Sequence, residues 1–138
     1  MAKKILIIDD HGHIRFMLNN RLKKIGYETA TAEDATNILN LTRAENPDLI
    51  IIDMMMPGID GIEASKILSQ NDYTKNIPII MLTALSSKNV VLDALRSGIR
   101  DYIVKPFKAD ELYKKIKNLI GDPAPEQDKE SKEVPSSE

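Results

Sequence analysis

Five polar residues come at the ends of short apolar runs, where together they could carry out phosphoryl chemistry. They are Asp9, Asp10, Asp53, Thr83 and Lys105. Three carboxylates that converge on one crevice repel one another, so such a group is stable only with a cation. Oxygen ligands with waters completing the shell suit Mg²⁺. The sequence has no cysteine for a thiolate site, and His11 and His13 are not arranged like zinc ligands.

The same residue types fit a group transfer through an acyl phosphate. With a divalent ion bound, one carboxylate can act as the nucleophile toward a phosphoryl group. The transfer needs in-line positioning and neutralisation of the charge on the phosphoryl oxygens. The ion can cover one oxygen, the Lys105 ammonium a second and the Thr83 hydroxyl a third. Taken singly, each of these residues is an ordinary turn, strand or loop residue, and only their joint placement favours a functional site.

The elements that must position these residues are five successive β–α units. Nearly continuous apolar runs over residues 5–8, 49–52, 77–82 and 102–104 are typical of parallel strands covered on both faces, and a weaker run covers 27–31. The stretches between the runs carry apolar stripes at helical spacing. The stripes are Ile14, Leu18, Leu22 and Ile25; Ala35, Ile38 and Leu39; Ile62, Ile67 and Leu68; Leu92, Leu95 and Ile99; and Leu112, Ile116, Leu119 and Ile120. This alternation predicts an α/β fold whose ligands lie beyond the carboxyl ends of the strands.

Composition indicates a single domain followed by a polar tail. The chain has 138 residues and a formal net charge of -2, which excludes nucleic-acid binding through bulk charge. No apolar run is long enough to span a membrane, and the start lacks the layout of a secretory signal, so we expect a soluble, cytoplasmic protein. Residues 122–138 contain six acids and three of the seven prolines. We therefore expect a folded domain over 1–121 and a disordered acidic tail over 122–138.

Four motifs together resemble the receiver domain of two-component response regulators. They read Ile-Ile-Asp9-Asp10, Ile-Ile-Asp53-Met-Met-Met-Pro57-Gly58-Ile-Asp60-Gly61, Met-Leu-Thr83-Ala84 and Tyr102-Ile-Val-Lys105-Pro106-Phe107. The resemblance covers residues 3–120 and implies a flavodoxin-like, doubly wound (βα)5 fold. It implies a parallel sheet with the strand order 2-1-3-4-5.

The resemblance assigns roles at the acidic site. Asp53 matches the phosphoacceptor, which receives its phosphoryl group from a histidine kinase or a histidine phosphotransfer protein. Asp9 and Asp10 match the acidic pair that binds Mg²⁺, together with Asp53 and the backbone carbonyl of Met55. The protein would then catalyse only its own phosphorylation and a slow autodephosphorylation.

The resemblance also implies a switch. Thr83 and Lys105 match the pair that contacts the phosphoryl oxygens, and the Lys105–Pro106 bond matches one that is cis in the family. Tyr102 matches the aromatic residue whose rotamer is coupled to Thr83. Phosphorylation would reshape the face built from the fourth helix, fifth strand and fifth helix, on which Val91, Tyr102 and Lys115 are candidate contacts for a downstream protein. We expect neither direct DNA binding nor a membrane partner.

Two side chains suggest that the acyl phosphate is long-lived. Met55 and Leu85 match the positions that flank the path of the hydrolytic water, and both are apolar here. No polar side chain would then orient that water. His11 and His13, in contrast, are interpreted as solvated residues near the first helix.

Several alternatives remain open. The chain could be a receiver that works as an unphosphorylated scaffold, or a fragment of a larger regulator. A phosphatase of the haloacid dehalogenase type needs an Asp-x-Asp after the first strand, and Asp9-Asp10-His11 lacks that spacing. In a flavodoxin the first loop would have to bind a phosphate, which an acidic loop would repel.

Overall fold

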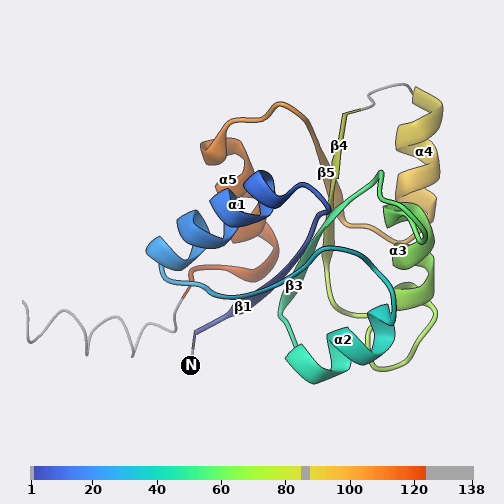
Figure 1. Cartoon of the computed structure of the whole chain (residues 1–138), viewed down its shortest axis with the longest axis horizontal. Helices are drawn as coiled ribbons and strands as arrows, with labels where there is room; N and C mark the ends of the chain where they lie inside the picture. The colour runs from blue at the N-terminus through green and yellow to red at the C-terminus, as the bar shows by residue number, and fades with distance from the viewer. Residues whose placement is uncertain (1, 85–87, 124–138) are drawn as a thin grey trace, which may run out of the picture.

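The computed structural model describes residues 2–84 and 88–123 (Figure 1). In this part of the chain, strands and helices alternate throughout. The strands are β1 (Lys4–Ile8), β2 (Glu28–Ala32), β3 (Leu49–Asp53), β4 (Ile79–Thr83) and β5 (Asp101–Val104). The helices are α1 (Gly12–Lys24), α2 (Ile38–Glu45), α3 (Gly61–Ser69), α4 (Lys88–Arg96) and α5 (Ala109–Ile120). The five β–α units expected from the sequence are confirmed.

The strands form one parallel sheet in the order β2-β1-β3-β4-β5, as expected. Helices α1 and α5 cover one face of the sheet, and α2, α3 and α4 cover the other (Figure 1). The winding direction reverses between β1 and β3, which are neighbours in the sheet. A crevice at this switch point is where such folds bind ligands.

The core consists of two apolar layers separated by the sheet. Every residue of β3 and β4 is buried, as are the last four residues of β1. Because side chains alternate along a strand, Leu6 and Ile8 pack on the side of α3, whereas Ile5 and Ile7 pack on the side of α1 and α5. Burial on both faces explains why these strands read as continuous apolar runs.

Helix α3 begins directly beside the end of β3. The Asp60 carboxylate accepts a hydrogen bond from the Glu63 backbone N–H at 2.8 Å and so caps the helix. A Cβ atom at Gly61 would lie 2.6 Å from the backbone oxygen of Asp53, so only glycine fits at this point. Helix α2 has no such cap. It begins at Ile38, and the preceding Asn37 has a left-handed backbone conformation and forms no side-chain capping hydrogen bond.

The prediction for the exposed face of α4 is wrong. Leu92, Leu95 and Ile99 were expected to form its core stripe. Ile99, beyond the end of the helix, is buried, but Leu92 and Leu95 are 40% and 44% exposed. Ala94 is buried instead, and Val91, expected to be the exposed residue, is half-buried. Gly98, just beyond the end of α4, lies close to the end of α3, where a Cβ atom on it would come within 2.7 Å of the Ser69 Cβ.

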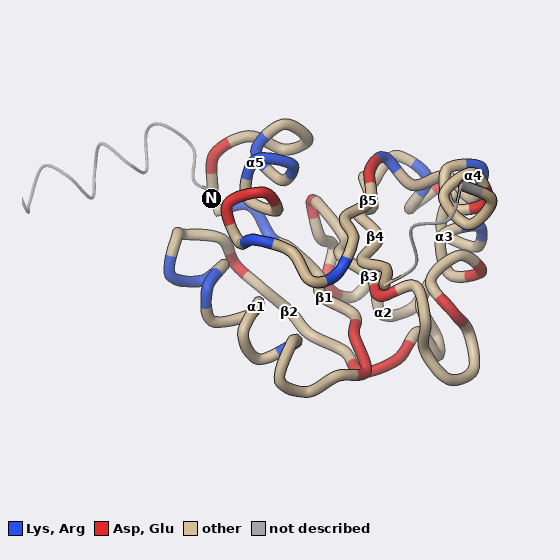
Figure 2. The backbone as a smooth tube through the Cα atoms, turned by 90° about the horizontal axis from the view of Figure 1, so that it is seen from above, with Lys and Arg blue, Asp and Glu red and all other residues tan. Residues whose placement is uncertain are grey.

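The end of the described chain packs against the domain. The Pro123 carbonyl accepts a hydrogen bond from the Lys3 backbone N–H at 2.8 Å. The remainder of the expected tail, residues 124–138, lies outside the described residues, as does Leu85. Acidic and basic residues are interspersed along the described chain (Figure 2). No described helix has both the length and the apolar character that a bilayer crossing requires.

Candidate functional site: an acidic cluster at the sheet edge

The polar residues predicted from the sequence lie together at the carboxyl ends of the central strands. Asp9 follows β1 and is fully buried, and Asp53 ends β3 with 3% of its surface exposed. The Lys105 ammonium, which follows β5, bridges the two carboxylates. Its Nζ lies 3.4 Å from Asp9 Oδ2 and 3.2 Å from Asp53 Oδ1. One cation therefore faces two buried anions, and Asp10 adds a third carboxylate at the surface of the same cluster.

The Asp53 carboxylate is the least satisfied group of the cluster. Its Oδ2 atom is buried and has no hydrogen-bond partner. Burial raises the pKa of Asp53, and the nearby Asp9 charge raises this pKa further, while Lys105 opposes both effects. A buried anion with an unpaired oxygen is costly without a further cation. The geometry and donor set fit a divalent metal ion held by Asp9, Asp10 and Asp53.

His11, which the sequence indicated only as a solvated residue at the start of the first helix, also borders the cluster. Its Nδ1 atom lies 3.2 Å from Asp9 Oδ1, 3.3 Å from Asp10 Oδ1 and 3.8 Å from Asp53 Oδ2. The side chain is 53% exposed, so it is only partly solvated. Its position in the sequence could have indicated this contact, because a residue that directly follows an acidic pair at a strand end lies beside the same crevice.

Thr83 and Lys105 border the cluster from β4 and β5. Thr83 is 3% exposed, and its hydroxyl donates to Met54 Sδ at 3.5 Å. The Lys105–Pro106 peptide bond is cis, as the sequence motif led us to expect. Met55 is 59% exposed just beyond the end of β3. The backbone carbonyl of Met55 as a metal ligand stays a prediction.

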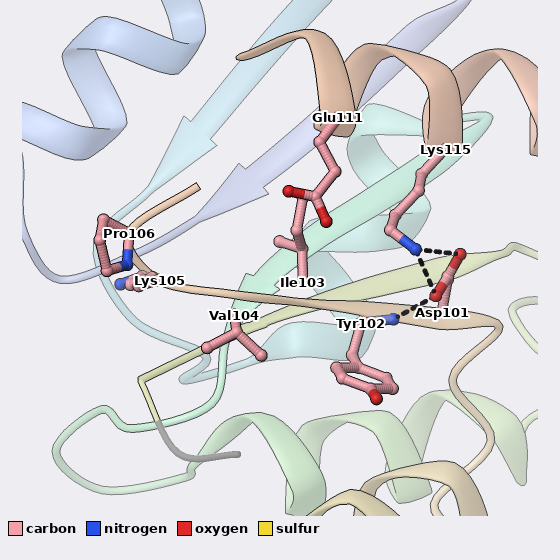
Figure 3. Close-up of a pocket in the computed structure, with 8 residues that line it drawn as sticks. All are labelled: Asp101, Tyr102, Ile103, Val104, Lys105, Pro106, Glu111 and Lys115. Atoms are coloured by element: carbon pink, nitrogen blue, oxygen red, sulfur yellow. Dashed lines mark hydrogen bonds and ion pairs between the residues drawn. The ribbon is translucent and has the colours of Figure 1, made fainter. Parts of the chain in front are cut away.

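The expected partner face carries a pocket along β5. It is lined by Asp101, Tyr102, Ile103, Val104, Lys105, Pro106, Glu111 and Lys115 (Figure 3). Lys115 pairs with Asp101 at 3.0 Å on the side of α5. The half-buried Tyr102 ring points to the opposite side of β5 and packs against the core layer that contains Ala94 of α4.

The sequence matches the family described as "Response regulator receiver domain" over residues 5–117. The chain belongs to this family. Receiver domains are signalling domains, and the match begins at the second residue of β1 and ends at Lys117 within α5.

Relatives of this receiver domain include regulators of different lengths. A "Probable transcriptional regulator ycf27" of Cyanophora paradoxa is 42% identical over 118 residues, which are 86% of this chain and 48% of that protein. The "Chemotaxis protein CheY" of Pseudomonas aeruginosa is 34% identical over 85% of this chain and 95% of its own length. The solved chemotaxis protein CheY4 of Vibrio cholerae superposes with a TM-score of 0.81 at 32% identity, covering 86% of this chain and 99% of that one. The chain thus spans about half the length of the transcriptional relatives and nearly all of the chemotaxis ones.

Proposed function

We propose that this receiver accepts a phosphoryl group on Asp53 from a histidine kinase or a histidine phosphotransfer protein. The observation that supports the proposal most strongly is the Asp53 carboxylate itself. It is buried at the switch point, Lys105 contacts one of its oxygens at 3.2 Å, and the other oxygen has no hydrogen-bond partner. A carboxylate oxygen attacks the phosphorus of a phosphohistidine as the N–P bond breaks. The products are an acyl phosphate on Asp53 and a free imidazole.

The surrounding charges support this chemistry. Asp9, Asp10 and Asp53 would hold Mg²⁺, with the Met55 carbonyl as a further ligand. The bound ion would neutralise charge on the phosphoryl oxygens. Lys105 supplies a second positive charge on the opposite side of Asp53, and Thr83 supplies a hydroxyl at the end of the adjacent strand.

The output would pass through the face formed by α4, β5 and α5. Phosphorylation adds negative charge and strong acceptor oxygens beside Thr83. Movement of the Thr83 hydroxyl toward these oxygens would change the space that Tyr102 can occupy. Tyr102 and Thr83 lie on paired strands, with Thr83 opposite Val104 in the register. A downstream protein would read this change through Val91, Tyr102 and Lys115, so the domain signals rather than turning over a substrate.

One of the longer relatives is named a DNA-binding regulator, which bears on whether the partner of this chain is DNA or a protein. The "DNA-binding response regulator MtrA" of Mycolicibacterium paratuberculosis is 38% identical, and this chain covers 51% of its length. In this chain the family match covers a receiver domain over residues 5–117. We propose that the receiver acts through protein contacts, and the absence of direct DNA binding stays a prediction.

Intact mass after incubation with acetyl phosphate tests this function. The wild type should gain one phosphoryl group only when Mg²⁺ is present, and Asp53→Asn should gain none. Asp72→Asn is a matched control, because this carboxylate is 93% exposed and distant in sequence from the cluster. The same mass gain in Asp53→Asn as in the wild type would refute Asp53 as the acceptor.

A further inference from the structure

We propose that His11 is a nitrogen ligand of the metal site, which makes it a mixed nitrogen–oxygen site that favours Ni²⁺ and similar transition metals over Mg²⁺. The inference deepens the function proposed above and rests on the presence of a metal site there. It begins from the position of the imidazole, whose Nδ1 faces all three carboxylates at 3.2–3.8 Å.

Each of the two buried carboxylates turns one oxygen toward Lys105 and the other toward His11. Lys105 contacts Asp9 Oδ2 and Asp53 Oδ1. The other oxygen of each, Asp9 Oδ1 and Asp53 Oδ2, faces His11 Nδ1. Asp53 Oδ2 is the independent sign of a missing ligand, since it belongs to a side chain 4% exposed and has no hydrogen-bond partner. The metal-facing side of the cluster is therefore lined by Asp9, Asp10 and Asp53 oxygens and one His11 nitrogen.

The spacing of these atoms fits one small ion. Ligands at about 2.1 Å from an octahedral ion lie about 3 Å apart when adjacent and about 4 Å apart when opposite. The distances from Nδ1 to the three oxygens fall in this range. Each of the four residues offers one ligand atom within 4.8 Å of the others, so an ion at their centre would draw the most widely separated atoms closer together.

The backbone holds the imidazole in this position. The His11 backbone N–H donates to Asp9 Oδ1 at 2.8 Å. His11 is also the residue that precedes α1, with an extended backbone (φ -86, ψ 108), and its side chain makes no cap bond to the helix. The ring is therefore turned toward the acids rather than toward the helix end. His13, two residues later, is exposed on the first turn of α1.

A nitrogen ligand changes which ion is preferred. Mg²⁺ favours oxygen ligands and keeps several waters, whereas imidazole suits first-row transition metals, whose affinity rises from Mn²⁺ to Ni²⁺. His11 should add to the binding of Ni²⁺ far more than to that of Mg²⁺.

Calorimetric titration with Ni²⁺ and, separately, Mg²⁺ tests the proposal on the wild type, His11→Asn, His11→Gln and His13→Asn. The ratio of Ni²⁺ to Mg²⁺ affinity should fall by roughly tenfold or more in both His11 variants, because even the loss of an outer partner of a metal ligand costs about 10–100-fold. It should stay at the wild-type value in His13→Asn. Pulsed electron paramagnetic resonance of the Cu²⁺ form should show the remote nitrogen of a bound imidazole in the wild type and lose it in the His11 variants.

The possible results distinguish a failure of this inference from a failure of the proposed function. If His11 acts only as a counter-ion, both affinities will change by the same factor, and the unchanged ratio will overturn the ligand role. The His13 ring meets the His11 ring edge-on, with 6.1 Å between the ring centroids. An equal fall of the ratio in His13→Asn would therefore show that the two rings act together or that the ion binds outside the cluster, and either result would overturn the assignment of the ligand to His11 alone. If the wild type binds neither ion, the metal site of the proposed function fails as well.

Discussion

Replacing the acceptor carboxylate should stabilise the metal-free domain. Asp53→Asn removes a buried negative charge next to Asp9 while keeping the shape of the side chain. Lys105 retains Asp9 as a partner at 3.4 Å, so the substitution does not strand the ammonium. The repulsion and the burial that raise the Asp53 pKa are the terms that the amide relieves.

The expected gain follows from removing a buried charge beside Asp9, since the amide keeps polar atoms in the same place. Leaving a buried polar group unsatisfied costs about 1–3 kcal/mol, and more for a charged group, while the lost contact with Lys105 offsets part of the relief, so we expect a net gain of about 1–2 kcal/mol. In a domain of this size that corresponds to a rise in Tm of roughly 4–8 °C. Mg²⁺ should reverse the order by stabilising the wild type, by about 2.7 kcal/mol at a hundred times its Kd.

The direction of the Asp53 pKa shift determines how the stability difference between the wild type and Asp53→Asn changes with pH. The folded-state pKa of Asp53 is raised, so its protonated form favours folding and its charged form opposes folding. The advantage of Asp53→Asn should thus grow as the pH rises above about 4, the ordinary pKa of an aspartate, and disappear as the pH falls below it. Thermal unfolding followed by circular dichroism in chelator, from pH 8 down to pH 4, measures both effects. An equal or lower Tm for Asp53→Asn at neutral pH would refute the electrostatic account.

Three further substitutions probe the stability of the fold and the lifetime of the phosphoryl group. The Tyr27 hydroxyl donates to the Gly121 carbonyl at 2.8 Å, and burial raises the pKa of Tyr27 to about 12. Tyr27→Phe should cost about 1 kcal/mol in urea unfolding and remove the part of the stability that the wild type loses between about pH 10 and pH 12. Gly61→Ala should cost about 1–3 kcal/mol or more in urea unfolding, because the new Cβ would lie 2.6 Å from the Asp53 backbone oxygen. Met55→Asn should hasten loss of the phosphoryl group in a mass time course by orienting water; unchanged decay would contradict this.

The sheet and the main part of the site could be predicted because they depend on local pattern. The central strands are buried on both faces and therefore read as apolar runs. Parallel strands bring their carboxyl ends to one edge, so Asp9, Asp53 and Lys105 had to converge once the order of the strands was known.

The face of α4 and the place of His11 could not be predicted in the same way. The pattern on α4 favoured leucines in the core, but the helix turns the small Ala94 inward and leaves Leu92 exposed. His11 was interpreted as solvated because its type and spacing match no zinc motif. Its orientation depends on a backbone hydrogen bond to Asp9 that no periodicity shows.

The most direct test of the central claim is the chemical position of the phosphoryl group. Borohydride converts an aspartyl acyl phosphate to homoserine, so peptide mass mapping after phosphorylation and reduction identifies the modified residue. We expect homoserine at position 53 alone, and only when Mg²⁺ was present during phosphorylation. Homoserine at Asp9 or Asp10 instead, or a phosphorylated chain without homoserine, would contradict the assignment of Asp53 as the acceptor.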